Sequence, residues 1–138
     1  MSEKRLEIAS YDELEALLAV ILEGKFSEDP IEKAVSGSPA LCAVLHRLVA
    51  ALKAWDVERY GEHVAERWSA WAAIDPTRRE WRAALARVED LPGWSSWPYE
   101  KQRRCAELLV APFRLSENLL DQFLSEASRA VERAGRPQ

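Results

Sequence analysis

The chain has 138 residues, of which 48% are hydrophobic and 30% charged, and its formal net charge is −4. A chain of this length buries about two thirds of its unfolded surface, so it needs no disulfide or metal to hold a core. Five Gly, seven Pro and two Cys exclude the collagenous, low-complexity and disulfide-scaffold classes. No window approaches ~20 consecutive apolar residues, so we expect no membrane span. The two cysteines, Cys42 and Cys105, fit the reduced thiols of a cytoplasmic protein.

The chain reads as helical from its first apolar stripe onward. Ala, Leu, Glu and Arg dominate, and β-branched residues do not alternate with a period of two. Ser10 and Glu13 form a capping box for a first helix over 11–23, which Gly24 ends. A short helix is predicted over 30–36, and proline at the first helical position after Ser38 opens the next one.

The helix face on which the apolar residues lie changes in the middle of the chain. Stripe residues from Leu41 to Trp55 fall within a sector of about 140° on the helical wheel. A second stripe, from Val57 to Trp71, is displaced from the first by about 200°. We therefore expect separate helices over 39–55 and 57–74, with a break or sharp bend near residue 55.

Three further helices are predicted over 76–90, 98–111 and 116–134. Proline opens the first two, Pro112 must kink or end the second, and Ser116 caps the last. The predicted architecture is one all-α domain over 1–138, a bundle of six or seven short-to-medium helices.

No pattern of catalytic or metal-ligating residues emerges. Cys42 and His46 stand at i and i+4, but a zinc site needs roughly three or four ligands and the chain holds only one further residue of each type. Arg59 and His63 lie beside a row of glutamates, which indicates ion pairing on a solvated face; general acid–base use of His63 is the alternative. Phosphate-binding glycine loops and nucleophile elbows are absent. We expect no catalytic residue, metal or cofactor, and an enzyme is not favoured.

Charge is distributed unevenly along the chain. Residues 1–35 hold nine acidic and four basic side chains (−5), whereas residues 76–115 hold five and eight (+3). Arg78 and Arg79 fall in the predicted first turn of a helix, where the helix dipole disfavours cations by a few tenths of a kcal/mol. A carboxylate or phosphate must offset them, either within the protein or on a partner.

Two of the six tryptophans, Trp94 and Trp97, lie in a loop bounded by proline and glycine, between basic clusters. Exposed, they would suit an anionic protein partner or single-stranded nucleic acid, although the net charge of −4 disfavours the latter. The alternative is that both rings fold back onto the core while the arginines pair with the acidic N-terminal helix. The candidate partner-binding residues are Arg78, Arg79, Arg82, Trp94, Trp97, Lys101, Arg103 and Arg104.

Two classes of function therefore stay open. The first is a protein-binding module of the inhibitor, immunity-protein, antitoxin or adaptor type, acting through that basic surface on an unknown protein partner. The second is a ligand-binding or catalytic bundle whose pocket is lined by the tryptophans on the predicted core stripes. A protein interior without a cavity would favour the protein-binding module, and a cavity of roughly several hundred Å³ would favour the ligand-binding or catalytic bundle. Homodimerisation through an exposed stripe and a nucleic-acid-associated role are further interpretations. The stripe tryptophans are Trp55, Trp68, Trp71 and Trp81.

Overall fold

A computed structural model describes residues 6–27 and 36–135 of the chain. In this part of the chain the fold is all-α, as predicted, with six α-helices, short 3-10 segments and no strand. None of these helices combines the length and the apolar character needed to cross a membrane. The elements are α1 (Tyr11–Lys25), α2 (Pro39–Tyr60), α3 (His63–Ala72), α4 (Arg79–Glu89), η2 (Trp94–Ser96), α5 (Tyr99–Val110) and α6 (Glu117–Gly135).

The predicted capping residues start their helices. The Ser10 hydroxyl accepts a hydrogen bond from the backbone of Glu13 at the start of α1. Ser38 caps α2 in the same way and Pro39 follows it at the first helical position. Ser116 accepts from the backbone of Leu119 as α6 begins. The predicted short helix over 30–36 lies outside the described residues except for its last position.

The predicted break near residue 55 is wrong. Helix α2 continues to Tyr60, and the chain turns at Gly61, whose φ of 99° and ψ of 171° suit glycine alone. The break falls at Gly61 instead, and most of the displaced apolar stripe lies beyond it, because Val64, Trp68 and Trp71 belong to α3, while Trp55 on α2 is 46% exposed. Trp55 is therefore not a core residue, contrary to the sequence prediction.

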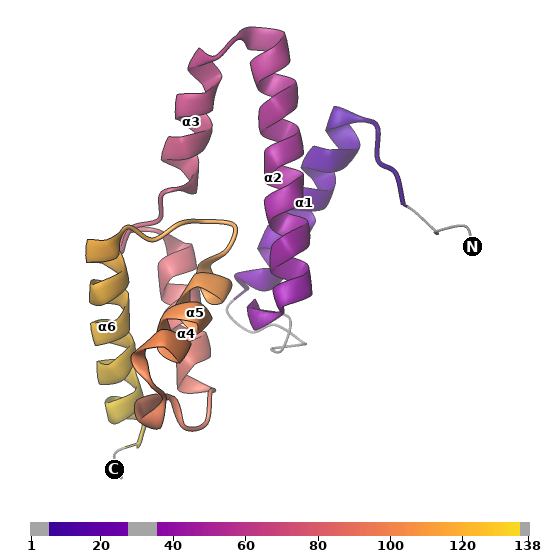
Figure 1. The fold of residues 1–138 in the computed structure, drawn as a ribbon. Coiled ribbons are helices and arrows are strands. Elements are labelled where there is room, and N and C mark those ends of the chain that lie inside the picture. The colour runs from indigo at the N-terminus through magenta and orange to yellow at the C-terminus, as the bar shows by residue number, and fades with distance from the viewer. Residues whose placement is uncertain (1–5, 28–35, 136–138) are drawn as a thin grey trace.

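The helices form two packed groups (Figure 1). In the first, α2 lies against α1, turns at its upper end, and α3 returns alongside it. In the second, α4, α5 and α6 pack against one another below α3. Each group has its own apolar cluster, and Leu22 and Trp71 contact both.

Polar contacts join the two groups. The linker after α3 pairs with the linker before α6, where Ile74 and Arg114 share a backbone hydrogen bond of 3.1 Å. At the end of α1, Lys25 is only 2% exposed, and its ammonium donates to the carbonyl oxygens of Leu108 at 2.8 Å and of Ala111. Lys25 thus binds the carboxyl end of α5, which fixes α1 against the second group.

Candidate functional site

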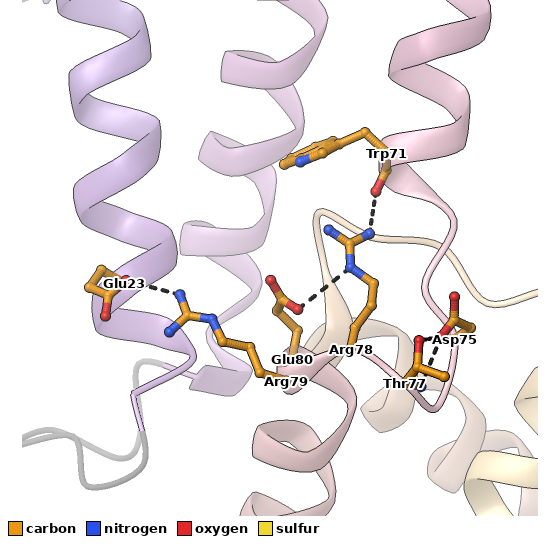
Figure 2. Close-up of polar contacts among 7 residues, drawn as sticks. All are labelled: Glu23, Trp71, Asp75, Thr77, Arg78, Arg79 and Glu80. Atoms are coloured by element: carbon orange, nitrogen blue, oxygen red, sulfur yellow. Dashed lines mark hydrogen bonds and ion pairs between the residues drawn. The ribbon is translucent and has the colours of Figure 1, made fainter.

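Arg78 finds its partners inside the protein. It is the residue before α4 instead of part of its first turn, and its guanidinium donates to the carbonyl oxygen of Trp71 (Figure 2). The same group lies 3.6 Å from the Glu80 carboxylate and 4.3 Å from the centre of the Phe113 ring. Arg78 therefore serves to hold the end of α3 over the start of α4.

Arg79 also pairs within the chain. Its guanidinium lies 2.9 Å from the Glu23 carboxylate of α1, as Figure 2 shows. This hydrogen bond lowers the pKa of Glu23 and raises that of Arg79. Both side chains are more than half exposed, so the pair adds little stability. The acidic N-terminal helix thus supplies the counter-charge of Arg79, which the sequence alone did not identify.

The loop tryptophans do not form an exposed pair. Trp94 is 1% exposed within the core of the second group, whereas Trp97 is half-buried with the Lys101 ammonium 4.1 Å from its ring centre. Arg103 pairs with Glu107 at 3.1 Å and with Glu117 at 2.7 Å. Three of the candidate partner-binding residues are exposed with no ion pair among the described residues: Arg82, Lys101 and Arg104.

The candidate partner-binding residues also lie apart. Arg78 and Arg79 stand at the start of α4, whereas Trp94 and Trp97 follow its end. A helix of eleven residues is about 16 Å long, so the two groups occupy opposite ends of it. The structure does not bring these residues together into one continuous basic, aromatic surface.

A cleft opens between the three helices of the first group. Its volume is about 570 Å³, and apolar and aromatic side chains form most of its walls. Helices α1 and α3 supply the two sides, while Leu52 and Asp56 of α2 lie between them. The lining residues are Tyr11, Glu15, Leu18, Ala19, Leu22, Leu52, Asp56, Tyr60, Val64, Arg67, Trp68 and Trp71.

Asp56 joins the two sides of this cleft. One carboxylate oxygen, Oδ2, accepts from the Trp68 indole N–H of α3 at 2.8 Å and from the Tyr11 hydroxyl of α1 at 3.4 Å. Partial burial, together with the Asp56 carboxylate, raises the pKa of Tyr11, so the phenol keeps its proton and remains a donor. Two neutral donors orient Asp56 without cancelling its charge.

The sequence identified only part of this site. Trp68 and Trp71 line the cleft, as the pocket hypothesis requires, and their rings meet edge to face with centroids 5.4 Å apart. Trp55 and Trp81 do not line it: the first is exposed and the second is 1% exposed in the other apolar cluster. The sequence does single out Asp56, as a charged residue between the two displaced apolar stripes. It does not show that Tyr11 lies beside Asp56.

Other candidate residues stay apart from this cleft. Cys42 is buried and its thiol donates to the carbonyl oxygen of Leu108 at 3.1 Å, while His46 is exposed. Burial raises the pKa of the Cys105 thiol. Among residues 6–27 and 36–135, no three His, Cys, Asp or Glu side chains are grouped to hold a metal ion.

Comparison with family models, with curated proteins and with solved structures finds no match.

Proposed function

We propose that this protein binds a small, largely apolar molecule in the cleft between α1, α2 and α3. The observation that carries the proposal is a cleft of about 570 Å³ whose mostly apolar walls converge on one oriented carboxylate. Ligand sites in proteins typically have volumes of roughly 300–1,000 Å³, mostly apolar linings and a few placed polar groups.

The partial exposure of two tryptophans favours ligand binding over simple core packing. Trp68 and Trp71 are only half-buried, although each packs against an apolar cluster. A ligand in the cleft would cover the remaining ring surface, and burial of apolar area contributes about 25 cal/mol per Å². Partly exposed aromatic rings that a ligand can cover are common in binding sites, because they bury much area with little loss of rotamer freedom.

Volume alone does not select this cleft. A groove of about 650 Å³ beside α4 and one of about 690 Å³ beside α1 are as large. The first is lined by three arginines, and its acid, Glu23, already pairs with Arg79; the second is lined mainly by aliphatic residues and has no aromatic ring. Neither groove therefore places an acid without an ion pair among several aromatic rings. The aromatic lining and Asp56 are what favour the cleft between α1, α2 and α3.

The protein-partner hypothesis stays a prediction with less support. Its proposed anchor Trp94 is buried, and Arg78, Arg79 and Arg103 already bind carboxylates of the chain. A cytoplasmic location also stays a prediction, and Cys42 and Cys105, both free thiols, are compatible with it.

The test is a titration of the full chain with phenethyl alcohol, a neutral aromatic probe, followed by NMR of the tryptophan indole N–H groups. The six indoles report on separate places in the fold. Binding in the cleft should move the Trp68 signal with a saturating dependence on probe concentration, while the buried Trp94 signal stays in place. Trp68→Phe assigns the Trp68 signal.

A matched pair of variants locates the binding. Ala19 lines the cleft from α1 and is exposed, so Ala19→Trp fills the space without removing a core side chain. Ala54 is also exposed but lies on α2 and does not line the cleft, so Ala54→Trp is the control. We expect Ala19→Trp to weaken binding by about tenfold or more and Ala54→Trp to leave it unchanged. Equal affinities for both variants, or no saturable shift in the unmodified protein, would refute the proposal.

A further inference from the structure

We propose that the ligand of the α1–α2–α3 cleft is an organic cation, an ammonium group attached to an apolar body. This inference rests on the proposed function and adds the chemical class of the ligand. It depends on how Asp56 is placed: an acid between aromatic walls, with hydrogen bonds to neutral donors and no counter-ion from the described residues.

The surroundings of Asp56 leave its negative charge uncompensated. Its Oδ2 atom accepts from Trp68 and Tyr11, both of which are neutral. No Lys, Arg or His among the described residues lies within ion-pair distance of it. A carboxylate has roughly four acceptor positions, so these two hydrogen bonds leave capacity for a donor from the ligand.

The remaining charges of the cleft lie on its edges and balance each other. Glu15 of α1 and Arg67 of α3 line the cleft and are both exposed, with one charge of each sign. Asp56 is more buried than either, and a charge acts most strongly where water is least available. The deeper part of the cleft is therefore negative.

The aromatic walls add to this preference. Tyr11, Tyr60, Trp68 and Trp71 all line the cleft around the acid. Aromatic faces attract cations through the negative charge of their π-systems, most strongly when the cation is partly desolvated. Carboxylate and rings together favour an ammonium ion and disfavour an anion of the same shape.

The experiment compares two probes of similar size that differ in charge. Phenethylammonium and phenethyl alcohol share the same aromatic body, and each is titrated into the full chain with the Trp68 indole N–H as the reporter. We expect the ammonium probe to bind about tenfold more tightly than the alcohol. Phenylacetate, the anionic counterpart, should bind more weakly than either.

The variants assign the charge effect to Asp56. Asp56→Asn keeps an amide oxygen to accept from Trp68 and Tyr11 but removes the charge, so we expect the two probes to bind it equally. Glu58→Gln makes the same change in charge two residues further on, at an exposed position that does not line the cleft, and should keep the tenfold preference.

The outcomes separate this inference from the proposed function. Equal binding of both probes to the unmodified protein would overturn the cation inference and leave the proposed function standing. Tighter binding of phenylacetate would overturn it as well, in favour of a site centred on Arg67. Absence of binding by every probe would overturn both. The comparison of probes on the unmodified protein needs no variant, so it decides even if Asp56→Asn fails to fold.

Discussion

Lys25 makes the stability of this protein rise in alkaline solution. Its ammonium is buried at the junction of α1 and α5, and burial lowers the pKa of Lys25 from 10.5 to about 8. Because the folded protein holds this proton less tightly than the unfolded chain, burial of the charge destabilises the fold wherever Lys25 is protonated in both states. That penalty is complete below pH 8 and disappears as the pH rises toward 10.5.

The magnitude follows from the difference between the two pKa values. A fall of about 2.5 units, at about 1.4 kcal/mol per unit, corresponds to about 3 kcal/mol of unfolding free energy gained between pH 8 and pH 10.5. The ammonium also donates to Cys42 Sγ at 3.7 Å, which opposes this gain, but the pKa of about 8 already includes that effect. The two hydrogen bonds to carbonyl oxygens persist. A neutral amine still carries two hydrogens, enough for the carbonyl oxygens of Leu108 and Ala111.

The assay is urea denaturation followed by tryptophan fluorescence at a series of pH values, with Lys25→Met as the comparison. Groups remote from Lys25 affect both proteins alike, so their contributions cancel in the difference. The unmodified protein should gain about 3 kcal/mol relative to Lys25→Met over this range, and the exposed control Lys101→Met should follow the unmodified protein. A constant difference between the unmodified protein and Lys25→Met at every pH would refute the reasoning.

Two pairs of variants test the packing and the chain reversal by chemical denaturation. The Trp81 indole N–H donates to Glu126 at 3.0 Å, whereas the buried Trp94 N–H has no partner among the described residues; Trp81→Phe should therefore cost about 1–2 kcal/mol more than Trp94→Phe. Equal costs would contradict this. Gly61→Ala should destabilise by about 1–3 kcal/mol because of its positive φ, while Gly24→Ala, inside α1 with open space around it, should stabilise by up to about 1 kcal/mol. Destabilisation by Gly24→Ala would contradict its placement inside α1, and no destabilisation by Gly61→Ala would contradict the positive φ at the turn.

Features that depend on neighbouring residues were predictable. Ser10, Ser38 and Ser116 each cap the helix that follows them, because a serine hydroxyl binds a backbone N–H within the first turn whatever the rest of the fold does. The break in the long central pattern was misplaced for a different reason. An apolar stripe marks the core only where a partner covers it, and Trp55 stays 46% exposed although the Tyr11 ring packs against it with centroids 6.1 Å apart.

The candidate site depends on contacts that the sequence by itself does not determine. Helical periodicity and capping determined that the chain is all-α and roughly where most of its helices lie, since both act within a few residues. Only the tertiary structure decided which charges pair and where a cleft forms. Arg79 meets Glu23 across 56 positions, and Asp56 meets Tyr11 across 45, so both contacts depend on how helices pack. Their packing leaves α1 and α3 on either side of α2, with a negatively charged, aromatic cleft between them.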